Sequence, residues 1–454
     1  MRIGPFGWSN RCCAPVLFCL FCCALCSVAS TRNAKVESPR QQQPVARMPQ
    51  IDSAARTEVA EKFAQALADD YAYADKGSAM AAAIRAKLSA NDYDAITSLS
   101  DFAHALERDA RAVVDDRHIE VDFSPGPKQM PVTDKGSSSF NGAIPEVRIL
   151  DGNIGYIVIN AMLADPASIA AAFAFVHNTD ALILDLRGDS GGFGPVASLC
   201  MSYLSGGPSR LLDTVHWRNG AIYESRTTNL DGRSYGDKKP VFILTSHQTF
   251  SAAEALAYDI QSFKRGIIVG ETTGGGANPS TPGETVPLSH GFFARIPTGY
   301  LVNAATGTNW QSVGVKPDFE VPADQALAKA WSLALSRLAS TATNPEARDL
   351  LKALSAAKLD GDASLSNAQL VGRYFSKSGD ATLVITEKND TLYGKENYND
   401  GETANIVFRP AGGNRYTRTG FPDGFSLTFA ERNGKTKLIQ MQPPPRESSI
   451  LEKQ

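Results

Sequence analysis

Cysteine is nearly absent from most of the sequence. Six of the seven cysteines lie between Cys12 and Cys26, and only Cys200 follows them. A lone thiol cannot close an intrachain disulfide, so a disulfide-stapled fold is excluded. We expect Cys200, which lies at helical spacing among apolar residues, to pack in the core.

Metal-binding patterns are missing as well. The sequence has no H-x-x-E-H or H-E-x-x-H motif and no paired Cys and His at zinc-ligand spacing. Because zinc sites need such ligand sets, we predict no metal and no other cofactor.

Neither sign of charge is in excess. The 454 residues carry 45 Lys and Arg against 48 Asp and Glu, a formal net charge of -3. Nucleic-acid-binding proteins usually carry a basic excess or a basic patch, so no nucleic-acid partner is expected. The length allows two or three domains with a substantial core.

Long hydrophobic runs are also lacking. The longest, Ala14 to Cys26, is too short to span a bilayer. It follows two arginines and precedes the small residues Ser27-Val28-Ala29, which indicates a secretory signal over residues 1–29. We therefore expect a periplasmic or secreted protein, held at a membrane only if a signal cysteine is lipidated.

The remainder divides by pattern into five segments. Polar residues predict a disordered linker at 30–50, and alanine-rich helical periodicity predicts an N-terminal helical domain at 51–125. Alternating strands and helices predict an α/β core at 140–335, followed by a linker at 336–368. Period-two alternation predicts a small antiparallel β domain at 369–454.

The string GDSGG at 188–192 raises the question of a nucleophile, because the same string surrounds the reactive serine of trypsin-like proteases. Those enzymes are all-β. Here the string follows the apolar run 181–186 and precedes a helical pattern that begins near Pro195, which is a strand, a glycine turn and a helix. The context therefore argues against Ser190 as a nucleophile.

Ser251 is the better candidate. The apolar strand Val241 to Thr245 runs through a short turn into a helix that begins with Ser251. A serine in this place is most often only an N-cap. A serine at the carboxyl edge of a sheet, above a helix N-terminus, is also well placed for nucleophilic attack, but it needs partners.

Six motifs in order resemble one known family. They are VRILDGNIGYIVI, LILDLRGDSGG, TSHQTFSAAEALAYDIQ, IIVGETTGGGANP, PTGYLVNAATGTNW and VGVKPDFEV. The sequence resembles the tail-specific or C-terminal processing serine peptidases, in the tricorn-like branch named after interphotoreceptor retinoid-binding protein. The resemblance covers roughly residues 51–322. It implies a crotonase-like α/β peptidase core behind an N-terminal helical domain.

The same resemblance implies roles for particular residues. Ser251 would be the nucleophile. Backbone N–H groups of Gly191, Gly192 and Ala252 would form the oxyanion hole that stabilises the tetrahedral intermediate. Ser190 would then lie beside the hole.

The general base has two candidates. Relatives with a Ser-Lys dyad carry their lysine where this sequence has Gly276, so the lysine mechanism is absent. The resemblance instead implies that His118, in DDRH, is the base, although a histidine after two aspartates is usually a solvated loop residue. His247, four residues before the serine, is the other candidate, although its turn would point it sideways.

The third partner departs from the family pattern. Relatives carry an acid where this sequence has Gln311, in NWQSVGVKPD. An amide can orient an imidazole through its carbonyl oxygen but cannot stabilise imidazolium by charge. We therefore expect Gln311 to orient His118, with activity reduced or even lost.

The leading hypothesis is an exported serine-type peptidase that acts on peptide or protein substrates. The alternative is a weak or inactive carrier of retinoid-like or fatty-acid-like ligands on the same fold, and a third is an interaction module acting through the β domain. The 35 residues between His118 and Ile154 are too few for a PDZ module. The substrate and the oligomeric state stay open.

Overall fold

The computed structural model describes residues 50–124, 141–281, 283–356, 365–376, 381–398, 403–410, 414–418, 426–432, 435–441 and 449–454. The predicted signal and residues 30–49 of the predicted linker lie outside these residues. Within the described ranges, no helix combines the length and the apolar character needed to cross a bilayer.

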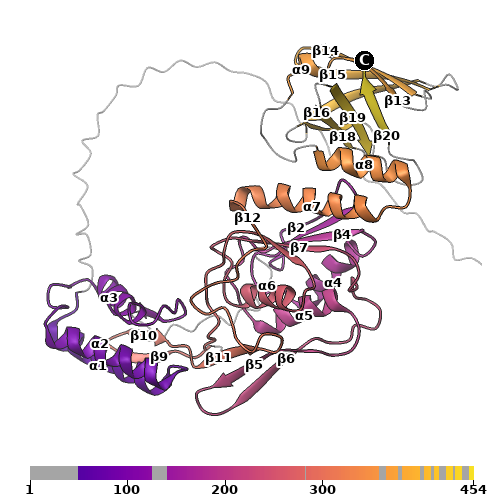
Figure 1. The fold of residues 1–454 in the computed structure, drawn as a ribbon. Helices are drawn as coiled ribbons and strands as arrows, with labels where there is room; N and C mark the ends of the chain where they lie inside the picture. The colour runs from indigo at the N-terminus through magenta and orange to yellow at the C-terminus, as the bar shows by residue number, and fades with distance from the viewer. Residues whose placement is uncertain are drawn as a thin grey trace, which may run out of the picture. The chain divides into compact units, whose positions relative to one another are not determined.

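Three helices and a strand form the N-terminal part, drawn in indigo in Figure 1. They are α1 (Ser53–Asp70), α2 (Ala74–Ser89), α3 (Leu99–Arg111) and β1 (Glu120–Phe123). Asp52 caps α1 by accepting a hydrogen bond from the N–H of Ala55 at 2.8 Å. The stripe of Val59, Phe63 and Leu67 is fully buried between the helices, which is what its helical spacing predicts.

A hairpin from far along the chain completes this layer. Strands β9 (Val286–Ser289) and β10 (Phe292–Arg295) join β1 in an antiparallel sheet of order β1-β10-β9. Leu288 and Phe292 pack in one core with the helices. The predicted assignment of all residues 140–335 to the α/β core therefore differs from the structure in this segment.

The central sheet has six strands in the order β12-β8-β7-β4-β3-β2. Only the pair of β2 and β3 is antiparallel; the others are parallel. The strands are β2 (Glu146–Leu150), β3 (Ile154–Val158), β4 (Ala181–Asp185), β7 (Val241–Thr245), β8 (Ile267–Gly270) and β12 (Phe319–Glu320). Because β4 and β7 are buried at every position, they appear in the sequence as continuous apolar runs.

Helices cover both faces of this sheet (Figure 1). One face packs on α4 (Pro166–Phe175), α5 (Gly194–Ser205) and α6 (Ala252–Ser262). The other packs on α7 (Ala326–Thr341), which is joined by α8 (Pro345–Ala356). The linker predicted from residue 336 is therefore wrong as far as Ala356, because Leu354 of α8 is fully buried in this layer.

A second small sheet has the order β11-β5-β6, from β5 (Leu211–Trp217), β6 (Ile222–Arg226) and β11 (Gly299–Asn303). Residues Ala323–Gln325 form a short 3-10 turn before α7.

The C-terminal strands form a closed antiparallel barrel after the short helix α9 (Asn367–Leu370). Closure comes from pairing of the first strand with the last, with Tyr374 opposite Lys453. The strands are β13 (Gly372–Ser376), β14 (Ala381–Lys388), β15 (Thr391–Tyr398), β16 (Thr403–Pro410), β17 (Arg415–Arg418), β18 (Ser426–Arg432), β19 (Lys435–Met441) and β20 (Ser449–Lys453). The predicted antiparallel β domain is confirmed, and its closure is the new feature.

Candidate active site

Ser251 occupies a strained turn between β7 and α6. Its backbone has φ +54° and ψ -119°, a region that L residues rarely adopt. Such strain is held in place only by surrounding contacts and occurs most often at functional sites. A sharp strand-to-helix turn of this kind lifts a serine hydroxyl out of the backbone, where it can attack a substrate.

His118 meets this serine from the N-terminal part of the chain. Its Nε2 lies 2.9 Å from the Ser251 Oγ, although 133 residues separate the two in sequence. The imidazole stacks on the Phe250 ring with centroids 4.6 Å apart, and only 15% of the side chain is exposed. The predicted nucleophile and the predicted base are therefore brought together.

Asp116 lies next to the His118 imidazole and was not predicted from the sequence. Its carboxylate is fully buried, and its Oδ1 lies 3.6 Å from the His118 Nδ1 and accepts the His118 backbone N–H at 3.0 Å. The Tyr71 hydroxyl and the Asn278 amide donate to Oδ2 at 2.9 and 2.8 Å. The only available signal was an acid two residues before the histidine.

The Asp116 carboxyl is ionised at neutral pH. Burial acts to raise its pKa, but the charge of His118 and the hydrogen bonds from the Asn278 amide and the His118 backbone N–H outweigh burial and lower the pKa below its usual value. A buried anion therefore lies beside the imidazole.

Gln311 does not orient the imidazole, so that prediction needs correction. Its Oε1 accepts the N–H groups of Ala277 and Asn278 at 2.7 and 3.1 Å, and its Nε2 donates to the Asp115 carbonyl at 3.1 Å. The His118 Nδ1 has no hydrogen-bond partner among the described residues. Gln311 instead ties the segment that carries His118 to a neighbouring loop.

Gly276 shows why a lysine cannot stand at its position. A Cβ there would lie 2.3 Å from the Phe250 ring and 2.7 Å from the His118 Cε1. The imidazole and its stacking partner thus fill the space that a longer side chain would need.

Glu254 joins the turn that carries Ser251 to the loop that contains Gly275 and Gly276. Its carboxylate is fully buried and accepts the backbone N–H groups of Ser251, Gly275 and Gly276 at 2.7–2.8 Å. Burial raises its pKa, and these bonds act in the opposite direction. Glu254 therefore fixes Ser251 relative to the loop that packs against His118.

The glycine turn lies directly against Ser251. A Cβ on Gly191 would come within 2.8 Å of the Ser251 Cβ, and both Gly191 and Gly192 have positive φ, at +102° and +147°. The Gly191 N–H, however, donates to Asp189 Oδ1 at 2.8 Å. Of the three predicted oxyanion donors, Gly192 and Ala252 keep N–H groups with no acceptor among the described residues, while the Gly191 donor is occupied.

Among the described residues, the remaining candidates make no hydrogen bond to Ser251 or His118. The side chain of Ser190, which is exposed, makes no hydrogen bond to a histidine among the described residues. His247 is 76% exposed, and its Nδ1 lies 2.9 Å from the Thr272 carbonyl. Within the described part of the chain, no three His, Cys, Asp or Glu side chains are grouped so that they could hold a metal.

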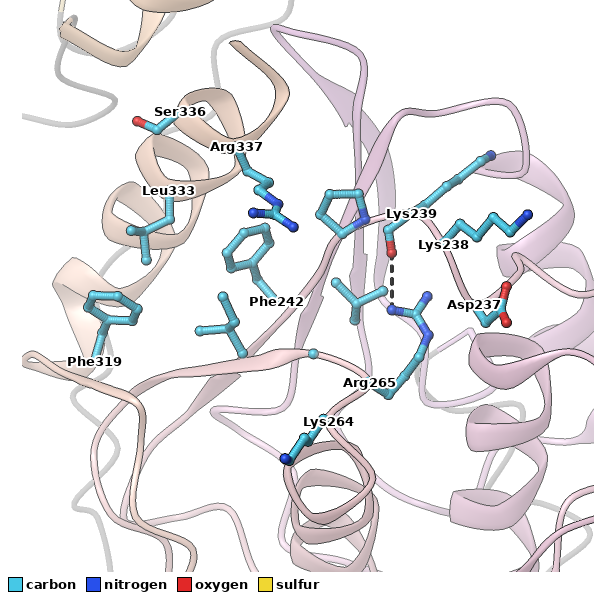
Figure 2. A pocket seen from close by; sticks show the side chains of 14 residues that line it. Asp237, Lys238, Lys239, Phe242, Lys264, Arg265, Phe319, Leu333, Ser336 and Arg337 are labelled. Atoms are coloured by element: carbon cyan, nitrogen blue, oxygen red, sulfur yellow. Dashed lines mark hydrogen bonds between the residues drawn. The ribbon is translucent and has the colours of Figure 1, made fainter. Parts of the chain in front are cut away.

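A hollow of about 630 Å³ lies at the amino ends of β7 and β8, whereas Ser251 follows the carboxyl end of β7 (Figure 2). Arg265 in its wall donates to the Lys239 carbonyl at 3.0 Å (Figure 2). This hollow is separate from the serine and histidine.

Two family models match the chain. The model of the "N-terminal domain of Peptidase_S41 in eukaryotic IRBP" matches residues 52–158, and the model of "Peptidase family S41" matches residues 153–321. Both models are of peptidase family S41, and together they match residues 52–321 of the chain. These matches agree with the resemblance found in the sequence motifs.

Individual relatives match the chain over shorter stretches or at low identity. The chloroplastic C-terminal processing peptidase of Tetradesmus obliquus is 30% identical over 142 residues, which is 31% of this chain and 28% of the relative. A candidate peptidase structure from Parabacteroides merdae is 15% identical with TM-score 0.47, covering 64% of this chain and all of the other. A lipoprotein structure from Streptococcus agalactiae is 18% identical with TM-score 0.42, covering 62% and 96%.

Proposed function

We propose that this protein is an exported serine peptidase in which Ser251 is the nucleophile and His118 is the general base. The observation that carries the proposal is the 2.9 Å contact between the His118 Nε2 and the Ser251 Oγ. The imidazole nitrogen is therefore within hydrogen-bond reach of the hydroxyl proton of a serine that stands on a strained strand-to-helix turn. A ligand carrier has no use for this pair.

The chemistry follows from the geometry. The His118 Nε2 takes the Ser251 proton as Oγ bonds to the substrate carbonyl carbon, and the carbonyl oxygen becomes an oxyanion. The N–H groups of Gly192 and Ala252 are placed to donate to that oxyanion. His118 then passes its proton to the leaving amine as the C–N bond breaks. Water, activated by the same imidazole, hydrolyses the acyl-enzyme.

Asp116 supplies the charge that Gln311 cannot. Its ionised carboxylate lies 3.6 Å from the Nδ1 that becomes positively charged when His118 accepts the proton. Opposite charges at this separation in a buried site favour the imidazolium. We therefore assign Asp116, rather than Gln311, as the third partner of Ser251 and His118.

Location and substrate class complete the proposal. The signal pattern at residues 1–29 supports a periplasmic or secreted location, with a lipid anchor as the less favoured form. The substrates are peptides or proteins, and the family resemblance supports cleavage near chain ends. Neither a nucleic acid nor a PDZ module is part of the proposal.

A peptide-library digestion followed by mass spectrometry tests this function. The wild-type protein should cleave a defined subset of peptides, whereas Ser251→Ala and His118→Ala should leave the library intact. Ser190→Ala is the matched control and should cleave like the wild type. An intact library with the folded wild-type protein, together with saturable binding of a fluorescent fatty acid, would favour the carrier.

A further inference from the structure

Asp189 is a buried acid that the proposed reaction does not use. Its side chain is fully buried, and its Oδ2 has no hydrogen-bond partner among the described residues. Its Oδ1 accepts the N–H of Gly191 at 2.8 Å. Buried polar atoms are nearly always paired, so a carboxyl oxygen left alone beside an active site calls for an explanation.

The Asp189 carboxyl lies at the edge of the oxyanion hole. Its backbone carbonyl accepts the N–H of Phe250, the residue before the nucleophile, at 3.0 Å. Gly191, whose N–H the Asp189 side chain accepts, packs against Ser251. The next residue, Gly192, offers one of the two free N–H donors. The Asp189 carboxyl therefore bonds the residue that directly precedes the oxyanion donor Gly192.

The groups around Asp189 stabilise its charge only in part. Burial raises its pKa to about 7, and the backbone N–H groups of Gly191 and Met162 only partly oppose this. The titratable side chain that faces it is the Cys200 thiol of α5, whose own pKa is raised by burial and then by the Asp189 charge. Arg187, two residues earlier, is turned towards Asp185 and the Ala323 carbonyl.

We propose that Asp189 is a proton-operated brake on the oxyanion hole: the neutral acid permits formation of the oxyanion, and the carboxylate opposes it. This inference rests on the proposed function. A fixed and buried negative charge beside a developing negative charge raises the energy of the transition state. The protonated acid removes that charge, while its carbonyl oxygen still accepts the Gly191 N–H.

The brake predicts a particular pH profile. Activity falls above about pH 7 as Asp189 ionises. A site in which Asp189 stayed neutral would keep its activity over this range. The descending limb is the signature of Asp189.

Asp189→Asn tests the brake, because an amide has nearly the shape of the neutral acid and keeps the acceptor for Gly191 but cannot ionise. We expect D189N to match the wild-type kcat near pH 6 and to exceed it by about tenfold at pH 8.5, with KM little changed. Asp213→Asn is the matched control. Asp213 is another buried acid whose pKa burial raises to about 7, but it bonds Asn303 of β11. D213N should keep the descending limb.

Binding of a peptide boronate, which forms a tetrahedral anion on a reactive serine, gives a second readout. The wild-type affinity should weaken above pH 7, and the D189N affinity should not. A descending limb shared by the wild type and D189N would overturn the brake, as would lower activity of D189N at every pH. Absence of both cleavage and boronate binding in the wild type would instead reject the proposed peptidase function itself.

Discussion

At the scale of single residues, the proposed site brings a serine, a histidine and an acid together. Ser251 and His118 are in hydrogen-bond reach of each other, and the Asp116 carboxylate lies 3.6 Å from the His118 Nδ1. Asp116 is in turn held by Tyr71 and Asn278. Because Asp116 is fully buried, its charge is poorly screened and acts strongly on its neighbour.

Asp116→Asn should therefore lower kcat. The amide keeps the size of the side chain but removes the charge that favours imidazolium, and we expect a loss of about a hundredfold with KM little changed. Tyr71→Phe removes one donor to Asp116 and leaves its charge, so its loss should be much smaller. Steady-state kinetics on a cleaved peptide measure both. Equal losses in the two variants would contradict a role for the charge.

Gln311→Glu should lower activity, the reverse of what a direct contact with His118 would give. Glutamate could still accept the N–H groups of Ala277 and Asn278, but it would lose the donor to the Asp115 carbonyl and place a negative charge against that oxygen. We expect a several-fold fall in kcat/KM, with Gln311→Ala similar or worse. A rise in Gln311→Glu would restore the original assignment of this residue.

At the scale of elements, hydrogen bonds hold two turns and a loop together around Ser251. The Ser246 hydroxyl donates to the Arg187 carbonyl at 2.6 Å, and the Thr249 hydroxyl donates to the Leu186 carbonyl at 2.8 Å. These bonds join the turn after β7 to the turn after β4. Glu254, in the first turn of α6, accepts hydrogen bonds from the loop 273–276 and from Ser251, and so joins this loop to the turn after β7.

Glu254→Gln should loosen this arrangement. Each carboxylate oxygen accepts at least two hydrogen bonds, so an amide would turn an NH₂ group towards donors that it cannot pair with. We expect a destabilisation of about 1–3 kcal/mol and slower labelling of Ser251. Thermal unfolding and a labelling time course measure the two effects. An unchanged Tm together with an unchanged labelling rate would contradict a role for Glu254 in holding the Ser251 turn.

The sequence predicts those elements whose signals are local. The apolar runs of β4 and β7 predict buried strands. The turns that follow these strands contain the glycines and Ser251, which the sequence marks as candidate site residues. The pairing of β1 with β10 joins Glu120 to Arg295 and has no local signal. Asp116 was not predicted for a similar reason, because its hydrogen-bond donors Tyr71 and Asn278 are distant from it in sequence.

At the scale of the whole molecule, buried acids should make stability depend on pH. Burial raises the pKa of Asp189 and Asp213 to about 7, and the Asp259 pKa is also raised well above its usual value. Asn303 bridges the last two, donating to Asp213 at 3.0 Å and to Asp259 at 2.7 Å. This bridge links α6 to the sheet of β5 and β11.

The direction follows from proton binding. Between the unfolded value of 3.8 and about pH 7, the folded state binds these protons more tightly than the unfolded state does. The free energy of unfolding therefore decreases with rising pH, by roughly 1 kcal/mol per pH unit for each such acid. We expect a higher Tm at pH 5 than at pH 8, with a smaller difference in Asp213→Asn. A Tm that rises over this range would contradict the assignment.

The central claim is that Ser251, activated by His118, is the nucleophile, and labelling with a fluorophosphonate followed by mass spectrometry of the digested protein tests it most directly. We expect one adduct, on the peptide that contains Ser251, formed by the wild type and absent from Ser251→Ala, with labelling strongly slowed in His118→Ala. An adduct on Ser190, or labelling that persists at full rate in His118→Ala, would contradict the account.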